Sequence, residues 1–527
     1  MRKVIISAMA VLMLFSSVGC TEAGADEAWK GNTGEINLGK MSVTGSGVSV
    51  ENNTVKITRG GDFTVTGTLD GGSIYVNTDD KVQLRLSGVS ITSSDGPAIF
   101  FDNTEKGFVT IAENTENFLA DSKEYTVEDA DAALFSNDDL EINGSGTLTI
   151  TGNCKHGIAS DDLSIESGNI VITAYEHTIK ANDALNVLGG NITVTSETGK
   201  GMKAEKELTI DGGDITITTK ESEGIESKGT LVINGGNIKI DAFEDGINTG
   251  TPDTTETDTA VAEDSEKDEE SITDMQKRPQ MPDGEAPAQR GERGMRGQMR
   301  DGQTPPEIPE GEKPGRRDGR ATPPEIPEGQ ERGQRPGNGE GFSRIDEETA
   351  EAHSITINGG NIYIKSGGDG IDSNGNLTIN GGTVTIDGPE NSANGPLDSE
   401  GTMAINGGTV ITLSASGMIQ LPRSSDGQNI LRVTFSELQA AGSTVSVKDS
   451  DGREIMSSTA SGAYQTLIFS SKELKADGEY TILIDGSEKE KATITAGLTA
   501  VGSGFDGFGG FGGGRGPGGF GGRRPLQ

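Results

Sequence analysis

A short phrase that returns six times constrains the fold of this chain more than any other feature of its sequence. In each copy, a pair of glycines stands between two runs in which Val, Ile, Leu and Thr alternate with other residues. The pairs begin at Gly189, Gly212, Gly235, Gly359, Gly381 and Gly407, and the first three are 23 residues apart. Alternation with period two is typical of β-strands, and a repeat of this length indicates a solenoid in which each coil is one structural unit.

The repeat predicts an all-β fold, a right-handed parallel β-helix with about 22–23 residues in each coil. Helical repeats need apolar residues at a period near 3.6, which this chain lacks, and a propeller blade takes about 40–45 residues. Successive coils would stack through parallel ladders about 4.7–4.9 Å apart, with a glycine pair at one corner because glycine accepts positive φ. The asparagines before these pairs either cap their own turns or form a stacked amide ladder: Asn234, Asn358, Asn380 and Asn406.

Composition divides the rest of the chain around this solenoid. We predict a signal peptide at 1–19, a tether at 20–34, an N-terminal cap with the first coils at 35–155, regular coils at 156–250, a disordered insertion at 251–352, further coils at 353–425, a small antiparallel β unit at 426–500 and a disordered Gly-rich tail at 501–527. The insertion is rich in Pro, Gly, Arg and acidic residues, so it cannot bury enough apolar surface to order itself. Its position predicts a loop that leaves one coil and returns to the next.

The N-terminus indicates export. Arg2 and Lys3 precede an apolar run, Val4–Phe15, that is too short to span a membrane. Gly19-Cys20 resembles a bacterial lipoprotein signal, in which lipidated Cys20 becomes the new N-terminus. Ser17 stands where such signals usually have Leu, so plain secretion is the alternative. We expect an extracellular or surface protein that touches the membrane only through such an anchor.

The chain is strongly acidic, with 82 Asp and Glu against 44 Lys and Arg and a formal net charge of −38. This balance argues against a nucleic-acid partner, because phosphate binding needs a basic surface. It is compatible with cations and with neutral polymers as ligands. It also favours solubility, which a secreted protein requires in any case.

A second element, reading x-Gly-Ile-x in most copies, keeps the same period and places polar residues in two columns. The residue before the glycine runs His156, His177, Lys200, Glu223, Asp245, Asp369. The residue two positions after the glycine runs Ala159, Lys180, Lys203, Glu226, Asn248, Asp372, Asp398. If the coils stack in register, one edge of the solenoid carries a block of cationic or titratable residues followed by an acidic block.

Stacked carboxylates repel one another unless a cation lies between them, and calcium suits such a column because it takes six to eight oxygen ligands. The candidate ligands are Asp161, Asp162, Asp183, Glu223, Glu226, Asp245, Asn248, Asp369 and Asp372. A solvated acidic face is the alternative. At the junction of the two blocks, lysines and glutamates would pair across coils, contributing well under about 1 kcal/mol for each exposed pair.

Four stretches of the chain carry a family resemblance. They read HGIASDDLSIESGNIVIT at 156–173, EGIESKGTLVINGGNIKIDAFEDGIN at 223–248, GGDGIDSNGNLTINGGTVTIDGP at 367–389 and GMIQLPRSSDGQNILRVTF at 417–435. Over about 130–500 the chain closely resembles a bacterial carbohydrate-binding domain family of secreted right-handed β-helix proteins similar to polysaccharide lyases. The resemblance implies binding of plant-type polysaccharide, cellulose or pectin chains such as polygalacturonate, with calcium at the Asp-Gly-Ile-Asp corners. The long insertion departs from the compact body of that family.

We therefore expect a monomeric, non-catalytic binding protein that docks a linear polysaccharide along one face of the β-helix. With one Trp and six Tyr in the chain, hydrogen bonds and calcium bridges to uronate carboxylates would dominate over aromatic stacking. Two alternatives stay open. One is a calcium-dependent, pectate-type lyase with Lys180, Lys200 or Lys203 as the base. The other is a structural surface adhesin.

Overall fold

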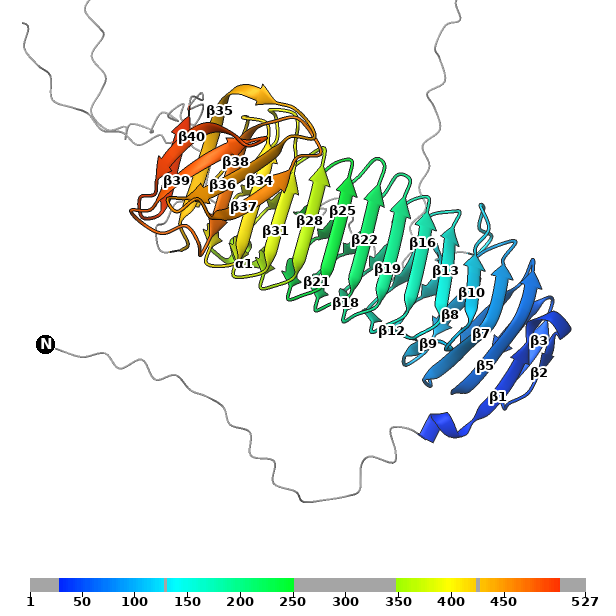
Figure 1. Ribbon diagram of the computed structural model, residues 1–527. Helices are drawn as coiled ribbons and strands as arrows, with labels where there is room; N and C mark the ends of the chain where they lie inside the picture. Colours follow the sequence, from blue (N-terminus) through cyan, green and yellow to red (C-terminus); the bar gives the residue numbers. More distant parts are fainter. Residues whose placement is uncertain (1–27, 128–129, 251–346, 423–426, 503–527) are drawn as a thin grey trace, which may run out of the picture. The chain divides into compact units, whose positions relative to one another are not determined.

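The computed structural model describes residues 28–127, 130–250, 347–422 and 427–502. In these residues the chain winds into a parallel β-solenoid of about 11 turns with coils of about 23 residues (Figure 1). The near strands in Figure 1 run upward while successive coils step from right to left, which is the sense of a right-handed coil. The predicted all-β, parallel β-helix is confirmed. The predicted signal peptide, Cys20 and most of the predicted insertion and tail lie outside the described residues.

Each regular coil contributes one strand to each of three ladders, which we call the first, second and third faces, whereas the long strands at 61–70 and 82–92 take part in both the first and the second. The first face contains β5 (Gly61–Asp70), β7 (Val82–Thr92), β10 (Glu116–Ala120), β13 (Thr147–Gly152), β16 (Asn169–Ala174), β19 (Asn191–Ser196), β22 (Asp214–Thr219), β25 (Asn237–Ala242), β28 (Asn361–Ser366), β31 (Thr383–Asp387) and β34 (Thr409–Ser414). The second face contains β9 (Gly107–Ile111), β12 (Leu140–Gly144), β15 (Leu163–Ile165), β18 (Ala184–Val187), β21 (Glu207–Ile210), β24 (Thr230–Ile233), β27 (Ile355–Ile357), β30 (Leu377–Ile379) and β33 (Met403–Ile405).

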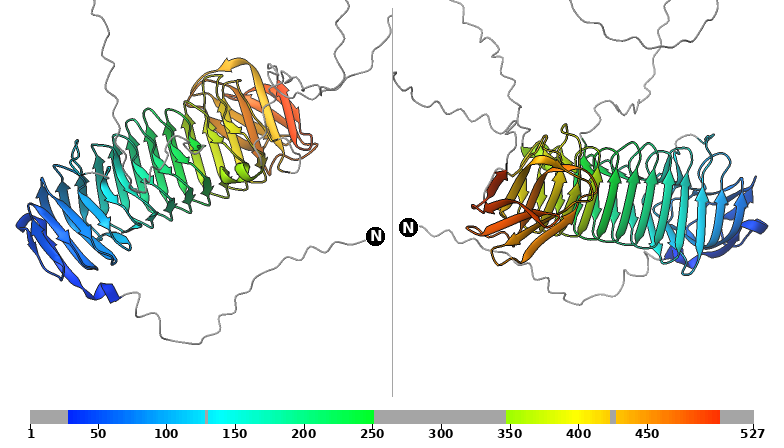
Figure 2. Two further views of the ribbon diagram at one scale, coloured as in Figure 1. Left: turned by 180° about the vertical axis from the view of Figure 1, so that it is seen from behind. Right: turned by 45° about the horizontal axis from the view of Figure 1, so that its top comes forward.

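The third face holds the x-Gly-Ile-x element. Its strands include β6 (Ser73–Asn77), β8 (Ile99–Asn103), β11 (Ala132–Ser136), β14 (His156–Ser160), β17 (Ile179–Ala181), β20 (Met202–Ala204), β23 (Ile225–Ser227), β26 (Ile247–Thr249), β29 (Ile371–Ser373) and β32 (Leu397–Ser399). Alternate side chains point inward, so Ile179, Met202, Ile225 and Ile247 stack with no exposed surface. The inward residues of the three faces merge into one continuous core of Ile, Leu and Val. Figure 2 shows the same stacking from behind.

Two glycine positions explain why the repeat is so regular. The second glycine of each pair takes a left-handed backbone conformation, as at Gly236, where φ is 93°. At Gly224 the glycine of the x-Gly-Ile-x element is required by space. A Cβ on Gly224 would lie 2.4 Å from Cγ2 of Ile240 and 2.6 Å from the carbonyl oxygen of Gly246. This coil therefore closes around its core without strain only when residue 224 has no side chain, whereas Thr178 and Pro396 occupy the equivalent position in two other coils.

The asparagines at the glycine-pair corner form the stacked ladder, which decides between the two alternatives. Asn358 donates to the side-chain oxygen of Asn234 at 2.8 Å, Asn380 to Asn358 at 2.9 Å, and Asn406 to Asn380 at 2.8 Å. At the other end of the ladder Asn234 donates to Oδ1 of Asp211 at 2.7 Å. Each amide thus bonds the amide of the next coil, which ties the corner together along the solenoid axis.

The insertion leaves and rejoins the solenoid without interrupting its ladders. Leu231 of β24 pairs with Ile355 of β27, and Ile247 of β26 pairs with Ile371 of β29, although about a hundred residues separate these strands in sequence. The last residues of the predicted insertion form a helix, α1 (Glu347–Ala352). Glu and Ala are strong helix formers. Ala350 is buried and accepts a hydrogen bond from the backbone of Asn376.

Antiparallel strands close both ends of the parallel ladders. The N-terminal strands are β1 (Thr33–Asn37), β2 (Ser42–Val43), β3 (Val48–Glu51) and β4 (Thr54–Ile57). The C-terminal unit contains β35 (Ile430–Gln439), β36 (Thr444–Asp449), β37 (Glu454–Thr459), β38 (Tyr464–Ser471), β39 (Glu479–Ile484), β40 (Ser487–Thr493) and β41 (Leu498–Gly502). β38 pairs antiparallel with both β34 and β35, so it covers the last edge of the first face, and the unit has its own apolar core. Exposed edges of this kind invite aggregation if they remain unpaired.

The close approach at Gly224 leads to a stability prediction. Gly224→Ala should lower the free energy of unfolding by about 2 kcal/mol, because the new methyl group must push apart two adjoining coils. Gly31→Ala is the matched control, since nothing lies within 4 Å of its Cβ position. Urea unfolding followed by circular dichroism measures both variants. Equal midpoints for the two variants would contradict the steric account.

Candidate functional site

The two polar columns predicted from the x-Gly-Ile-x element stack in register, and we call them together the charged stripe. The outward residues of consecutive third-face strands pair directly in the order Lys180, Lys203, Glu226, Asn248, Asp372, Asp398. The corner column beside them contains His156, His177, Lys200, Glu223, Asp245 and Asp369. Because neighbouring parallel strands lie about 4.8 Å apart, each side chain of the stripe meets its counterpart on the next coil.

The two histidines of the stripe accept hydrogen bonds from the backbone of the next coil. Nδ1 of His156 accepts the backbone N–H of His177 at 3.2 Å, and Nδ1 of His177 accepts that of Lys200 at 3.0 Å. Their rings stack with centroids 4.8 Å apart. Burial, together with the adjoining His156 and nearby lysines, lowers the pKa of His177 to about 2. This position of the expected cationic block therefore carries no charge at neutral pH.

His156, Glu176 and His177 form the one compact group of potential metal ligands in the described part of the chain, with ligand atoms within 4.8 Å of one another. Their hydrogen bonds oppose metal binding. A neutral imidazole whose Nδ1 accepts a hydrogen bond carries its proton on Nε2. Nε2 of His156 lies 3.3 Å from Asp131, and Nε2 of His177 lies 3.7 Å from Glu176, so both atoms face carboxylates. A metal at Nε2 would have to displace that proton, so the arrangement favours a structural role.

All three lysines of the stripe lie close to carboxylates. Nζ of Lys200 lies 3.1 Å from Glu223 and 3.2 Å from Glu226, so the cross-coil pairing considered for this junction occurs. These side chains are enclosed, with 16%, 14% and 4% of their surface exposed, and the small energy expected for an exposed pair does not apply. Burial opposes the charge of Lys200, but Glu226 and Glu223 outweigh it and raise its pKa.

The other two lysines are also engaged. Nζ of Lys180 lies 3.6 Å from Asp131, and Nζ of Lys203 lies 2.6 Å from Glu205. Asp131 and Glu205 lie outside the two polar columns, so the sequence analysis did not identify them as partners of these lysines. The basic half of the stripe is therefore electrostatically satisfied within the protein.

The acidic half of the stripe lacks such partners. It contains Asp245, Asn248, Asp369, Asp372 and Asp398, and no described Lys, Arg or His forms an ion pair with any of its four carboxylates. Asp245 accepts the backbone N–H of Asp369 at 2.6 Å, and Asp369 accepts that of Gly395 at 2.5 Å. These bonds satisfy one oxygen on each carboxylate and leave the negative charges facing one another.

The pKa values of two carboxyl groups in the acidic half are raised, as expected for buried carboxylates that lie close together. Burial, followed by the charges of Asp245 and Asp398, raises the pKa of Asp372 to about 7. Burial likewise raises the pKa of Asp245 to about 6, opposed by its hydrogen bond with the backbone of Asp369 and supported by the charge of Asp369. At neutral pH these groups are partly ionised, and a cation among them would relieve the repulsion.

The chemistry of the donors fits a hard cation. The amide oxygen of Asn248 is buried and has no hydrogen-bond partner, while its amide nitrogen donates to Asp245 at 3.5 Å. Carboxylate and amide oxygens from consecutive coils are the ligands that calcium prefers, with water completing its shell. Asp398 belongs to this group but was not among the predicted ligands. Its degenerate copy of the element, Gly-Pro-Leu-Asp, is the signal that places it in the column.

The predicted calcium ligands separate into three locations. Asp245, Asn248, Asp369 and Asp372 come together in the acidic half, whereas Glu223 and Glu226 pair with Lys200. The remaining three lie on a different corner, in the turns after β14 and β17. There Lys206 reaches Asp183 at 2.5 Å, Asn182 donates to Asp161, and the backbone of Ala184 donates to Asp162. These three aspartates do not join the acidic half.

Comparisons with known proteins bear on this solenoid. Residues 51–272 match the family model of carbohydrate-binding domain-containing proteins. A carbohydrate-binding domain-containing protein of Acetivibrio thermocellus is 33% identical over 187 residues, which cover 33% of this chain. The match spans 65% of that relative, just under two thirds of its length. The resemblance drawn from the sequence is confirmed at the level of a carbohydrate-binding family.

A solved structure is also similar. It is described as the polysaccharide lyase-like protein from C. thermocellum, in a gadolinium derivative. It is 30% identical, with a TM-score of 0.38, and the match covers 42% of this chain and 92% of that chain.

The raised pKa of Asp372 predicts how stability depends on pH. Between its ordinary value of 3.8 and about 7, the folded chain keeps a proton on Asp372 that the unfolded chain has released. The stability from this group is thus fully present below pH 3.8 and lost as pH rises to 7, a fall of about 2 kcal/mol between pH 5 and pH 8. His177 acts in the opposite direction, since its pKa lies below its ordinary 6.5.

Comparing the free energy of unfolding of one variant with that of the wild type separates the effect of Asp372 from that of His177. Asp372→Asn removes one titration while keeping the side-chain shape and leaving His177 in place. In the presence of a chelator, the variant should gain about 2 kcal/mol over the wild type between pH 5 and pH 8, measured by urea unfolding. Asp70→Asn, on an exposed strand end, is the control and should show no such trend. A pH-independent difference for Asp372→Asn would contradict the raised pKa.

Proposed function

We propose that this chain, which is related through residues 51–272 to carbohydrate-binding domain-containing proteins, is a non-catalytic polysaccharide-binding protein that uses calcium. The ligands proposed are plant-type polysaccharides, cellulose or pectin chains such as polygalacturonate. The observation that carries the calcium part is the acidic half of the stripe, where four carboxylates without a basic partner follow one another over three coils and the buried amide oxygen of Asn248 lacks a hydrogen bond.

Asp245, Asn248, Asp369, Asp372 and Asp398 would hold the calcium. The bound ion would supply positive charge that neutralises the stacked carboxylates and attracts the carboxylate of a uronate unit. The chain's own residues do the rest. Asp245 and Asp369 are oriented by backbone N–H groups of the following coil, so their remaining oxygens face the stripe without side-chain rearrangement. Such preorganisation lowers the entropy cost of binding.

The solenoid suits a polymer because both are periodic. Equivalent outward residues recur on every coil, about 4.8 Å apart, so an extended chain meets the same backbone environment at each step. A protein with a formal net charge of −38 repels a polyanion at long range. Binding of an acidic polysaccharide therefore needs local positive charge, which calcium in the acidic half would provide.

The ion pairs of the stripe disfavour the lyase alternative. A lysine that abstracts a proton must be neutral, and the two glutamates around Lys200 raise its pKa instead. Lys180 and Lys203 also lie within ion-pair distance of carboxylates. No specific observation favours the adhesin alternative over carbohydrate binding.

We also propose that the protein acts outside the cell, secreted or tethered through lipidated Cys20. The signal-like residues that support this proposal precede the described part of the chain. Within the described residues, no helix is both long and apolar enough to cross a membrane.

Isothermal titration with polygalacturonate tests the proposed function. In a buffer that contains calcium, the wild-type chain should bind polygalacturonate. When a chelator removes the calcium, the affinity should fall at least about tenfold, equivalent to about 1.4 kcal/mol. Equal affinity with and without the chelator would contradict the role of calcium but would leave the proposed carbohydrate binding in place. Unsaturated products, detected by their ultraviolet absorbance, would replace the binding role with lyase activity.

Thermal unfolding locates the calcium. A calcium concentration of about 100 times the dissociation constant should stabilise the wild type by about 2.7 kcal/mol and raise its Tm. Asp372→Asn should lose most of this response. Asp183→Asn is the matched control, because Asp183 was also a predicted ligand but pairs with Lys206 on another corner. Loss of the response in Asp183→Asn alone would place the calcium at that corner instead.

A further inference from the structure

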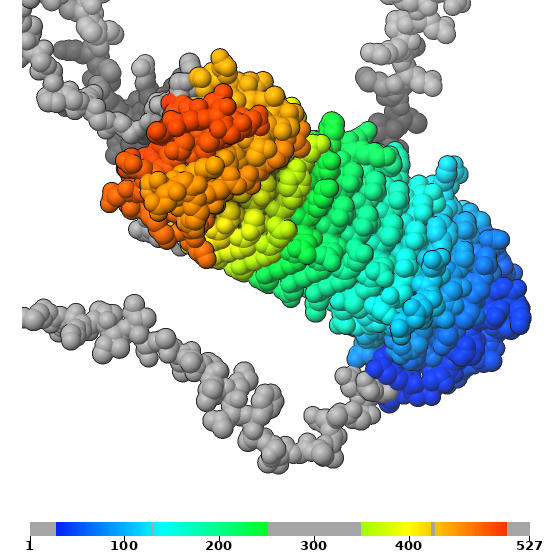
Figure 3. Space-filling view, in the orientation of Figure 1, coloured from blue at the N-terminus to red at the C-terminus, as the bar shows by residue number. Residues whose placement is uncertain are grey.

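The first face carries a hollow that the charged stripe does not include. It has a volume of about 500 Å³ and lies over β19, β22, β25 and β28. Its lining residues include Asn191, Asp214, Thr216, Asn237, Lys239, Asn361 and Tyr363. These are outward side chains of four consecutive strands, so the hollow runs across the strands and along the axis of the solenoid. Figure 3 shows this face in green, bordered by the C-terminal unit in orange.

Lys239 is the cation of this hollow. It is exposed, and in the described part of the chain it has neither an ion-pair partner nor a side-chain hydrogen bond. In the first face Lys239 stands directly between Thr216 and Tyr363, one coil away from each. The first-face lysine on the next coil, Lys365, is already paired, because its Nζ lies 3.6 Å from Asp241. An ammonium group left unpaired in so acidic a protein is available to an anionic ligand.

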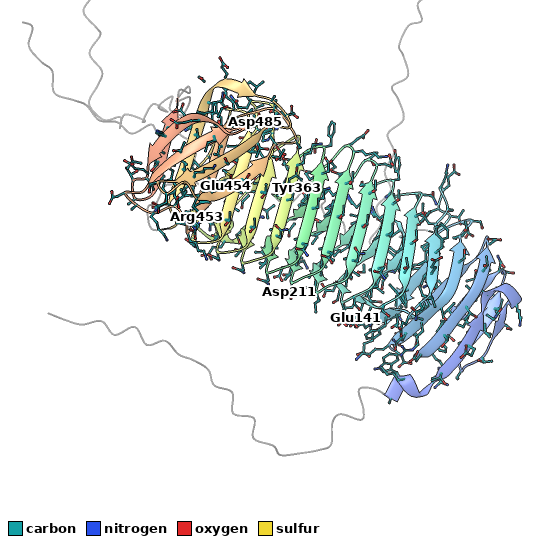
Figure 4. The ribbon with its side chains drawn as sticks, viewed as in Figure 1. Glu141, Asp211, Tyr363, Arg453, Glu454 and Asp485 are labelled. Carbon is teal, nitrogen blue, oxygen red and sulfur yellow. The ribbon has the colours of Figure 1, made fainter. Side chains whose placement is uncertain are left out.

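Tyr363 forms the end of the hollow nearest the C-terminal unit (Figure 4). Its hydroxyl donates to Oδ2 of Asp387 at 3.3 Å, and the same carboxylate oxygen accepts the backbone N–H of Ser461 at 2.5 Å. This chain of hydrogen bonds anchors the hydroxyl, while the ring remains partly exposed beside Lys239. A fixed, partly exposed aromatic ring is a surface on which an apolar face of a sugar ring can pack.

The row next to Lys239 supplies hydrogen-bonding groups at the same spacing. Asn191, Asp214, Asn237 and Asn361 follow one another on consecutive coils. Asn237 donates to Asp214 at 2.7 Å, whereas the exposed amides of Asn191 and Asn361 make no side-chain hydrogen bond in the described chain. Free amides on either side of a cation suit the hydroxyl groups of a sugar chain that extends across the strands.

From these contacts we infer that the hollow is a docking site for an acidic polysaccharide, with Lys239 pairing a uronate carboxylate and Tyr363 packing against an adjoining sugar ring. This inference rests on the proposed carbohydrate-binding function and names the surface and the residue that select an acidic chain. The site is separate from the charged stripe, because its residues lie on the first face and the stripe follows the third. The C-terminal unit borders one end, so the bound chain extends from Tyr363 toward β19.

Titration of full-length variants with polygalacturonate and with a neutral 1,4-linked glucan tests this assignment, in calcium throughout. Lys239→Gln should weaken polygalacturonate binding about tenfold and leave the neutral glucan unaffected, because only the uronate offers a charge. Lys239→Arg should restore most of the affinity. Tyr363→Ala should weaken both polymers several-fold. Lys220→Gln is the matched control, since Lys220 is an exposed lysine near the end of β22 that pairs with Glu197.

The outcomes separate the inference from the function on which it rests. If the wild type binds polygalacturonate and both Lys239→Gln and Tyr363→Ala bind equally well, the hollow is not the docking site, while the binding function stands. If the wild type binds neither polymer, both proposals fail. Calcium-induced stabilisation should be the same in Lys239→Gln and in the wild type. A loss of that stabilisation would mean that the substitution disturbs the stripe, and it would overturn the assignment of Lys239 to a separate site.

Discussion

In-register parallel pairing of successive coils is the constraint on which the rest of this structure depends. Each third-face residue lies opposite its counterpart one period later, from Lys180 and Lys203 to Asp372 and Asp398. Such pairing forces like side chains to stack. Inside the solenoid this favours stability, because Ile225 on Ile247 continues an apolar core. At the glycine-pair corner it also favours stability, because each amide of the asparagine ladder bonds the next.

The same pairing is unfavourable for charged side chains, because it stacks like charges on one another. The basic and acidic halves of the stripe differ in how this repulsion is reduced. In the basic half, His177 is neutral and accepts a backbone hydrogen bond, while Lys200 lies between two glutamates. In the acidic half, Asp372 carries a raised pKa because burial and four nearby carboxylates oppose its ionisation. A protein that keeps such a column without basic partners retains an unfavourable interaction that a bound cation relieves. That contrast is the reason for assigning calcium to the acidic half alone.

Periodicity made much of the fold predictable. The glycine pairs, the inward Ile positions and both polar columns repeat at one interval, so register followed from spacing alone. The charge state of His177 did not follow, because it depends on backbone N–H groups of the next coil. Helix α1 was missed because one short turn inside a low-complexity segment carries almost no pattern. Lys239 and Tyr363 were missed because their importance lies in what surrounds them, and their strands read as ordinary copies of the repeat.

By itself, the sequence determined the solenoid, its period, the corners and the order of residues in each column, since all of these depend on local spacing and on the conformations that glycine allows. Only the tertiary structure decided which charges are neutralised. Whether Glu226 meets Lys200, or Asp372 meets no cation, depends on side chains from different coils and on how deeply they are buried. Solvation and pairing between coils are properties of the assembled ladder, and they separate a structural column from a candidate binding site.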